Sequence, residues 1–281
     1  MKSKNVSSSA EKSKRVDRLE KLGVDLKSWD YVVALAGNPN TGKSTVFNSL
    51  TGLRQHTGNW PGKTVTRAEG GFSFQEKRYK MVDLPGTYSL LSTSEDEEIA
   101  RNFILFGEPD VTLIVIDSTR LERNLNLTLQ ILEITSKVVV CLNLIDEAER
   151  KGIVIDVEQL QSLLGVPVIP TSARYGDGLP KLLEAIKRIA SDKTSQLESK
   201  VSLTMPGELK EAIDDIESDL KVMYPNLPNT RWIALRLLEG DERIETALKN
   251  DEFSNLTNIY HRKFEDLNSV LDEINKEVTH E

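Results

Sequence analysis

Eight consecutive residues near the first quarter of the chain have the types and spacing that bind a phosphate chain. Their order, which matches the pattern GxxxxGK[ST], is Gly37-Asn38-Pro39-Asn40-Thr41-Gly42-Lys43-Ser44. Glycine lets the backbone wrap closely around phosphate oxygens, and the free amides that open a helix point at them. Lys43 would neutralise the β- and γ-phosphates, and the Ser44 hydroxyl would bind Mg²⁺. Since the motif lies between a strand-like run and a helix-like run, a chance glycine-rich turn is a poor alternative.

A second motif follows the strand-like run Lys77–Val82. Asp83-Leu84-Pro85-Gly86 has the form DxxG, so the Asp83 carboxylate would reach Mg²⁺ through water and the Gly86 amide would reach the γ-phosphate. Alone, Asp-x-Pro-Gly is also a good turn sequence. Its place about one strand–helix–strand unit after the phosphate loop favours the functional interpretation.

Asn143 and Asp146 form an NxxD pair directly after the strand-like run Val138–Leu142. The Asp146 carboxylate can accept two hydrogen bonds, from guanine N1–H and from its exocyclic amine, which adenine cannot offer. Asn143 would help hold the base and tie this loop to the phosphate loop. An isolated NxxD pair more often marks a capped loop, so the weight of this pair comes from its position.

A third loop suited to the base follows the strand-like run Val166–Ile169. Thr171-Ser172-Ala173 is similar to the loop whose backbone amide contacts guanine O6. Three small residues are weak evidence alone, but they stand after the last predicted strand.

The segment Arg54–Thr66 would be the mobile loop that senses the γ-phosphate. Such a loop needs a threonine whose hydroxyl binds Mg²⁺. Of the candidates Thr57, Thr64 and Thr66, we choose Thr64, which follows Pro61-Gly62. Trp60 is expected to anchor the loop, and His56 to be a surface residue. The complete predicted nucleotide-binding set is Gly37, Asn38, Pro39, Asn40, Thr41, Gly42, Lys43, Ser44, Thr45, Gly62, Thr64, Asp83, Gly86, Asn143, Asp146, Thr171, Ser172 and Ala173.

These residues need a framework that brings the ends of several strands together. The predicted strands are Tyr31–Ala36, Val65–Phe74, Lys77–Val82, Val111–Ile116, Val138–Leu142 and Val166–Ile169. The predicted helices between them are Ser44–Leu50, Glu95–Phe106, Asn124–Thr135, Val157–Leu164 and Pro180–Ala190. This alternation predicts an α/β fold with a mostly parallel sheet flanked by helices and ligands at the carboxyl ends of its strands. Together with the motifs above, it favours the Ras-like P-loop GTPase type.

Two of the predicted helices have local features of their own. Leu125, Leu129 and Leu132 give the helix Asn124–Thr135 an apolar stripe at helical spacing. The acidic run Glu95–Glu98 is expected to lie at the start of its helix and to stabilise that N-terminus.

After about residue 190 the strand-like runs stop. The predicted domains are a polar N-terminal arm (1–30), a GTP-binding domain (31–190), a linker (191–200) and a small all-α domain (201–281). The helices predicted for the last part are Glu208–Met223, Thr230–Leu238, Ile244–Lys249 and Leu256–Val278.

Composition excludes several classes of protein. The 281 residues are 38% hydrophobic and 28% charged, which is ordinary for a globular chain of one large or two smaller domains. The apolar runs are strand-sized, so we expect no membrane-spanning helix, and residues 1–14 are too polar for a secretory signal. The single cysteine, Cys141, cannot form an intramolecular disulfide, which favours a cytoplasmic location. It lies in a predicted buried strand and is expected to serve packing.

The charge is unevenly distributed. The net charge is −8; residues 1–22 carry seven basic and three acidic side chains, and residues 195–281 carry ten basic and nineteen acidic. A net-acidic chain is a poor general binder of nucleic acid, so no nucleic-acid partner is expected. The basic N-terminal arm could contact a membrane surface or RNA, but we favour its interpretation as a solvated tail.

Three runs together are specific: Gly58-Asn59-Trp60-Pro61-Gly62-Lys63-Thr64-Val65, Asn38-Pro39-Asn40 and Leu121-Glu122-Arg123-Asn124-Leu125. On these the chain resembles the cytosolic G-protein domain of the ferrous-iron transport protein B (FeoB) family over roughly residues 31–190. The helical tail is similar to that family's second cytosolic domain in position and character only. The resemblance implies GTP or GDP as ligand, Mg²⁺, and a membrane domain that moves Fe²⁺, present in cis or in trans. It also implies a place at the cytosolic face of the inner membrane.

The resemblance further implies potassium activation, with Asn40 helping to bind K⁺. Ras-type enzymes have a glutamine after DxxG, and Thr87 stands there in this chain. The groups expected to act on the reacting phosphate are then Lys43, Asn40, Thr64 and Gly86. Two residues depart from the family pattern: Lys63 replaces a small apolar residue and could compete with K⁺, and Leu144 replaces methionine.

Two other functions stay open on the sequence. One is a freestanding GTPase module with a separate protein partner. The other is a GTPase of ribosome assembly or tRNA modification, which also lacks the glutamine; the acidic tail counts against it. Homo-oligomerisation stays open as well.

Overall fold

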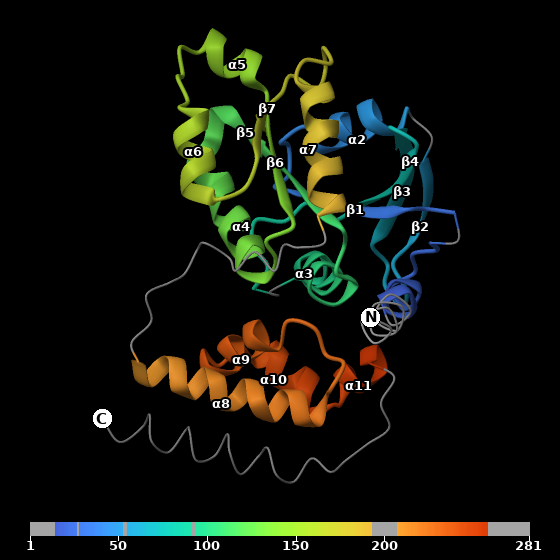
Figure 1. Ribbon diagram of the computed structural model, residues 1–281, viewed down its shortest axis with the longest axis vertical. Coiled ribbons are helices and arrows are strands. Elements are labelled where there is room, and N and C mark those ends of the chain that lie inside the picture. Colours follow the sequence, from blue (N-terminus) through green and yellow to red (C-terminus); the bar gives the residue numbers. More distant parts are fainter. Residues whose placement is uncertain (1–14, 27, 53–54, 92–93, 193–206, 258–281) are drawn as a thin grey trace, which may run out of the picture. The chain divides into compact units, whose positions relative to one another are not determined.

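The computed structural model describes residues 15–26, 28–52, 55–91, 94–192 and 207–257 (Figure 1). Contacts divide the chain into two compact units, Met1–Thr204 and Met205–Glu281. Each has a hydrophobic core of its own.

The first unit is built on one seven-stranded sheet in the order β2-β3-β4-β1-β5-β6-β7. The strands are β1 Tyr31–Gly37, β2 Gln55–Asn59, β3 Thr66–Phe74, β4 Lys77–Asp83, β5 Val111–Asp117, β6 Val138–Asn143 and β7 Val168–Pro170. Strands β4, β1, β5, β6 and β7 run parallel, whereas β2 and β3 are antiparallel neighbours at one edge. The predicted α/β class with a mostly parallel sheet is therefore confirmed.

Helices cover both faces of this sheet. The helical elements are α2 Lys43–Thr51, α3 Glu95–Gly107, η1 Ser118–Arg120, α4 Leu121–Ile134, α5 Ile145–Arg150, α6 Val157–Leu164 and α7 Leu179–Ser191. Helices α2 and α7 pack through Phe47 and Ile186 on the same core as Leu35, Leu113 and Cys141. The alternate strand residues are also buried, and α4, beside which α3 packs, contacts β1 and β5. Burial on both faces explains why β1, β5 and β6 read as continuous apolar runs.

The acidic run at the start of α3 lies as predicted. All four acids, Glu95–Glu98, are in the first turn, and the Glu97 amide donates to the Ser94 hydroxyl at 3.3 Å. Negative charge there complements the partial positive charge of the helix N-terminus.

The predicted stripe on α4 is wrong. Leu129 is 41% exposed and Leu125 is half-buried, so only Leu132 of the three lies in the core. Leu127 and Ile131 are buried instead. The buried face also includes the polar residue Thr128, whose hydroxyl donates to its own helix at 3.1 Å, and this polar position hid the true face from a hydrophobicity pattern.

Two short elements were not predicted. The loop expected over Arg54–Thr66 contains the edge strand β2, whose polar residues pair with β3 through their backbones. Helix α5 begins directly after Leu144, inside what was interpreted as the base-reading loop.

The interpretation of the N-terminal arm as a solvated tail is wrong for residues 15–26. Residues 15–21 are helical, and Leu19 and Val24 are fully buried. Two isolated apolar residues among charges gave no periodic signal, and their burial depends on a surface supplied by distant segments.

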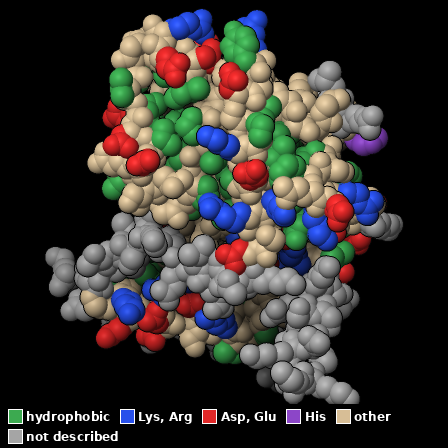
Figure 2. All heavy atoms as spheres, turned by 45° about the horizontal axis from the view of Figure 1, so that its top comes forward, with side chains coloured by type: hydrophobic (Ala, Val, Ile, Leu, Met, Phe, Trp, Pro, Cys, Tyr) green, Lys and Arg blue, Asp and Glu red, His purple; other side chains and the backbone are tan. Residues whose placement is uncertain are grey.

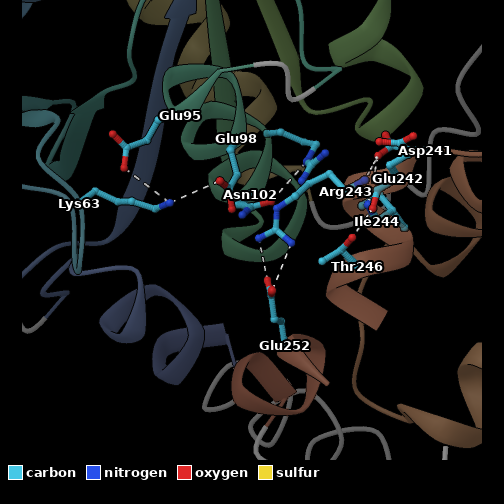
Figure 3. A network of polar contacts seen from close by, with 11 residues as sticks. Lys63, Glu95, Glu98, Asn102, Asp241, Glu242, Arg243, Ile244, Thr246 and Glu252 are labelled. Atoms are coloured by element: carbon cyan, nitrogen blue, oxygen red, sulfur yellow. Dashed lines mark hydrogen bonds and ion pairs between the residues drawn. The ribbon is translucent and has the colours of Figure 1, made fainter. Parts of the chain in front are cut away.

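The second unit is all-helical, with α8 Gly207–Met223, α9 Thr230–Leu238, α10 Glu242–Lys249 and α11 Glu252–Thr257. Its core contains Leu220, Trp232, Ile233, Leu248 and Phe253. Figure 3 shows Asp241 capping α10 by accepting from the amides of Arg243 and Ile244, at 3.0 and 3.1 Å. The Arg243 guanidinium joins α10 to Glu252 of α11 at 2.7 Å. Most of the predicted helix Leu256–Val278 and of the predicted linker lies outside the described residues.

Within the described ranges, none of the helices combines the length and apolarity needed to cross a membrane. No group of three or more His, Cys, Asp or Glu side chains that could hold a metal occurs among these residues either.

Candidate nucleotide-binding site

The glycine-rich loop joins the end of β1 to the start of α2 and is pressed against two neighbouring segments. Gly42 is the N-cap of α2 with φ 82°, and a Cβ there would lie 2.4 Å from Asn143 Nδ2. A Cβ on Gly37 would lie 2.5 Å from the Val115 carbonyl oxygen on β5. Such contacts leave room for glycine alone.

Other residues of this loop divide into buried and exposed groups. Thr41 is buried, and its hydroxyl donates to the Asn38 carbonyl at 3.0 Å. Asn40 is exposed in the left-handed conformation, with φ 65°, beside the half-buried Pro39. Ser44 and Thr45 are exposed in the first turn of α2.

Lys43 lies at the meeting point of the glycine loop and the DxxG turn. Its Nζ donates to the Asp83 carboxylate and, at 2.7 Å, to the Leu84 carbonyl. Burial raises the pKa of the Asp83 carboxyl, and the Lys43 ammonium acts in the opposite direction. A Cβ on Gly86 would lie 3.5 Å from the Pro39 nitrogen, so the end of the DxxG turn also contacts the loop.

Asn143 connects three loops. It is buried; its Nδ2 donates to the Thr41 carbonyl at 3.0 Å, and its Oδ1 accepts from the Ala173 amide at 3.1 Å. Thr171 contributes a longer hydroxyl contact to the same oxygen at 3.5 Å. One side chain therefore fixes the glycine loop and the 171–173 loop relative to β6.

Replacing Asn143 with alanine is expected to destabilise the chain by about 2 kcal/mol, because it leaves a buried carbonyl and a buried amide without partners. Nucleotide affinity should fall as well, since both loops lose their common anchor. Thermal or urea unfolding measures the first effect, and nucleotide titration the second. Asn126→Ala on the exposed face of α4 is the matched control. Unchanged unfolding in Asn143→Ala would contradict the connecting role.

Asp146 faces a cavity of about 230 Å³ beside this junction. Its Oδ1 accepts from the Ser172 hydroxyl at 2.7 Å, and its Oδ2 from Arg150 Nη2 at 3.1 Å. The Ser172 hydrogen bond, followed by the charge of Arg150, lowers the pKa of Asp146, so its carboxylate is charged at neutral pH. The residues lining the cavity are Gly42, Thr45, Asn143, Leu144, Asp146, Glu147, Arg150, Ser172, Ala173, Arg174 and Tyr175.

The Ser172 hydroxyl has a function that the sequence interpretation missed. The 171–173 loop was selected for its backbone amides, whereas this hydroxyl positions the Asp146 carboxylate. Thr171 is buried and its hydroxyl lies 3.0 Å from the Cys141 thiol. Burial raises the pKa of Cys141 to about 12, so the thiol stays protonated and serves packing, as expected.

The segment that carries Thr64 is anchored by Trp60. This indole is 4% exposed and meets the Phe103 ring of α3 edge-on, with centroids 5.5 Å apart. The Trp60 amide donates to the Val65 carbonyl at 3.0 Å, which closes the loop. Thr64 and Gly62 are exposed, and within the described ranges no hydrogen bond joins Thr64 to Lys43, Ser44 or Asp83. His56 is also exposed.

The Lys63 ammonium lies on the acidic start of α3. Figure 3 shows it between Glu95 and Glu98, at 3.6 and 3.4 Å. These two carboxylates offset its positive charge, and its competition with K⁺ stays a prediction.

A second cavity, of about 540 Å³, lies along the other flank of the glycine loop. Its lining includes Tyr88 and Arg123, which stack with the guanidinium 4.1 Å from the ring centre. The side-chain Nδ2 of Asn38 donates to the Arg123 carbonyl at 3.3 Å. In the sequence, the run Leu121–Leu125 contributed only to the family resemblance. Nothing in the sequence indicated that it lies beside the glycine-rich loop.

Comparison with known proteins gives a consistent result. The family model described as "Ferrous iron transport protein B" matches residues 31–186, and that of the "FeoB cytosolic helical domain" matches residues 206–281. The Fe(2+) transporter FeoB of Escherichia coli (strain K12) is 44% identical over 215 residues, which is 74% of this chain and 27% of the relative. The Salmonella typhimurium (strain LT2) transporter is 44% identical over 213 residues, with the same coverage. The chain thus spans about a quarter of the length of these relatives.

Solved structures agree. The cytosolic domain of the T. maritima FeoB iron transporter in apo form has a TM-score of 0.69 and 38% identity, covering 84% of this chain and 89% of that one. The G-domain of Methanococcus jannaschii FeoB has a TM-score of 0.52 and 45% identity, covering 58% and 98%. Together with the phosphate loop, the DxxG turn and the Asp146 pocket, these matches show that the chain belongs to the ferrous iron transport protein B family.

Proposed function

We propose that this chain is a GTPase that binds guanine nucleotide and hydrolyses GTP to GDP and phosphate. The observation that carries the proposal is the charged Asp146 carboxylate, held by Ser172, facing a cavity that also contacts Gly42 and Thr45. A base bound to Asp146 would then have its phosphates over the glycine loop. A related structure, the T. maritima cytosolic domain in GDP form, supports this assignment; it has 37% identity and a TM-score of 0.69.

Ser44, Thr64 and Asp83 would hold Mg²⁺. The Ser44 hydroxyl at the start of α2 and the Asp83 carboxylate at the end of β4 suit this cation, which prefers oxygen ligands and completes its shell with phosphate oxygens and water. When bound, Mg²⁺ would offset negative charge on the phosphates. For Thr64 to contribute, its exposed loop must move toward the glycine loop, which is the change expected of a nucleotide-sensing segment.

The chain's own residues would act mainly by position and charge. Lys43 would exchange its contact with Leu84 for phosphate oxygens, and the Gly86 amide would donate to the γ-phosphate. Thr87 is buried, so its side chain does not replace the glutamine of Ras-type enzymes. Backbone groups of the loop that carries Thr64 and of the DxxG turn would therefore align the attacking water.

Asn40 is proposed as a ligand for K⁺. Its side chain is exposed and its backbone is left-handed, with φ 65°. An amide oxygen is a neutral hard donor suited to a monovalent cation. K⁺ in this place would offset charge that develops between the β- and γ-phosphates during hydrolysis.

We expect GTP hydrolysis to be at least about tenfold faster in KCl than in NaCl, the scale expected for losing one well-placed charge-stabilising group. Asn40→Ala should remove the difference between the salts while retaining GDP binding. Phosphate release from GTP, with ATP in parallel, measures both activity and base preference. Equal rates in the two salts would contradict the potassium mechanism, and equal use of ATP would contradict the GTPase assignment.

The cellular function proposed is regulation of ferrous-iron uptake through a membrane domain, at the cytosolic face of the inner membrane. The relatives that carry this activity are named Fe(2+) transporters, and this chain matches about a quarter of their length. We propose residues 31–190 as the GTPase domain and 201–281 as its helical regulatory domain. A test is uptake of radiolabelled Fe²⁺ by cells whose transporter carries Lys43→Ala; unchanged uptake would contradict regulation by this site.

Family membership favours this function over ribosome assembly or tRNA modification. Among the described residues on the face shown in Figure 2, basic and acidic side chains are interspersed. Nucleic-acid-binding surfaces instead gather positive charge.

A further inference from the structure

Residues 15–26 precede the part of the chain that the family model matches, which begins at Tyr31. They pack on the GTPase unit all the same. Leu19 and Val24 are fully buried. A Cβ on Gly107, the last residue of α3, would lie 3.2 Å from both Leu19 and Leu22 side chains, so a bulkier residue there would press against the segment.

One end of the segment holds the C-terminus of α3. Arg18 Nε donates to the Phe106 carbonyl at 2.9 Å, and its Nη2 pairs with the Glu108 carboxylate. Arg15 donates to the Glu108 carbonyl at 2.8 Å and pairs with Asp110 at 2.7 Å. The last carbonyls of a helix have no partner within the helix, and cations at this end also interact favourably with its dipole. The two arginines therefore satisfy and fix the end of α3.

The other end of the segment holds the loop that carries Thr64. The Leu22 carbonyl accepts from Arg67 Nη1 at 3.3 Å. A Cβ on Gly23 would lie 3.0 Å from Pro61 Cγ and even closer to the Arg67 guanidinium, so the segment lies directly on both residues. Arg67 in turn lies over the Trp60 ring, 5.5 Å from its centre.

A chain of charges extends this second attachment to the sheet. Arg67 pairs with Glu69 at 2.9 Å, and Glu69 pairs with Lys80 at 2.6 Å. Lys80 Nζ donates to the Asp25 carbonyl at 3.0 Å. These side chains are mostly buried, with exposures of 9 to 16%. Ion pairs with limited access to water are screened less by salt than pairs on the open surface.

We propose that residues 15–26 form a clamp that positions the Thr64 loop relative to helix α3, with Arg18 and Arg67 as its positioning residues. Trp60 and Phe103 are the junction between loop and helix that the clamp spans. The clamp contacts the far end of α3, the helix that follows the DxxG turn in the chain, and it also contacts Pro61 in the loop that carries Thr64. The proposal rests on the proposed GTPase function. Releasing the clamp should weaken contacts made to GTP and leave those made to the base and to GDP.

The test compares three variants of the full chain. Leu19→Asp places a charge in the buried contact, Arg18→Gln removes the ion pair to Glu108, and Glu20→Gln on the exposed side of the same helix is the control. We expect the first two to speed amide hydrogen exchange in residues 60–67 by about tenfold, with residues 143–150 unchanged. The affinity for a non-hydrolysable GTP analogue should fall roughly five- to tenfold relative to that for GDP, and kcat should fall with it. Arg18→Lys should recover part of the effect.

Two results would overturn the clamp. One is unchanged exchange in residues 60–67 together with an unchanged GTP-to-GDP affinity ratio in Arg18→Gln. The other is a Leu19→Asp chain in which residues 15–26 exchange as slowly as in the parent. Failure of the GTPase assignment is distinguishable, because a parent chain that binds no guanine nucleotide still reports the clamp through hydrogen exchange.

Discussion

Replacing Lys43 with alanine is expected to weaken GTP and GDP binding by about 100-fold or more, equivalent to roughly 3 kcal/mol. The Lys43 side chain is 12% exposed and is the cation that the glycine loop places beside Asp83 and Leu84. Without it the phosphates would face the Asp83 carboxylate with no compensating positive side chain. A hydrogen-bonded charge that is largely removed from water contributes far more than a surface charge.

The measurement is titration with GDP and a non-hydrolysable GTP analogue by calorimetry. Lys181→Ala, an exposed lysine on α7, is the control for loss of one positive charge and should bind both nucleotides like the parent. Thermal unfolding must show that Lys43→Ala is folded. If the folded variant binds GDP within threefold of the parent, the phosphate site is elsewhere.

Replacing Asp146 with asparagine is expected to change the preferred base from guanine to xanthine. The charged carboxylate accepts from guanine N1–H and the exocyclic amine, whereas asparagine presents one acceptor and one donor. Xanthine has a carbonyl where guanine has that amine, so the asparagine amide can donate to it. A site built to hydrogen-bond one group rejects the analogue lacking it by a factor of about 10⁴, and part of this, roughly 100-fold, should be lost for GDP.

Ser172→Ala tests the hydrogen bond that holds the Asp146 carboxylate independently of the charge of Asp146. It keeps the charge of Asp146 and removes the hydroxyl that holds Oδ1 at 2.7 Å. We expect a loss of GDP affinity below about tenfold, the net contribution of one typical intramolecular hydrogen bond, because Asp146 keeps its charge and both acceptor oxygens; no gain for xanthosine diphosphate is expected. Competition between GDP and xanthosine diphosphate measures both variants. An Asp146→Asn chain that still prefers GDP would exclude Asp146 as the base-reading residue.

The central strands could be predicted closely because their surroundings are uniform. The predicted Tyr31–Ala36 became β1 Tyr31–Gly37, since a parallel strand buried on both faces is a continuous apolar run. The edge strand β2 has no such pattern: its residues are Gln55, His56, Thr57, Gly58 and Asn59. It forms by backbone pairing with β3, to which any residue with a free amide and carbonyl can contribute.

The packing of residues 15–26 could not be predicted from a sequence pattern either. Leu19 and Val24 stand singly among charged neighbours, so no helical or strand period marks them. The burial of Leu19 depends on the space that Gly107 of α3, far along the chain, leaves beside it. The charges of Arg15 and Arg18, which suggested a solvated arm, are instead matched by acids at the end of α3.

Local order along the chain was sufficient to predict that the glycine-rich loop, the DxxG turn and the NxxD pair follow the ends of parallel strands. Each is made of residues adjacent in sequence, and the carboxyl ends of parallel strands must meet at one edge of a sheet. The tertiary structure alone decided which side chains support them. Ser172 meets Asp146 across 26 positions and Asn143 meets Thr41 across 102, distances over which only the completed sheet brings a donor to its acceptor.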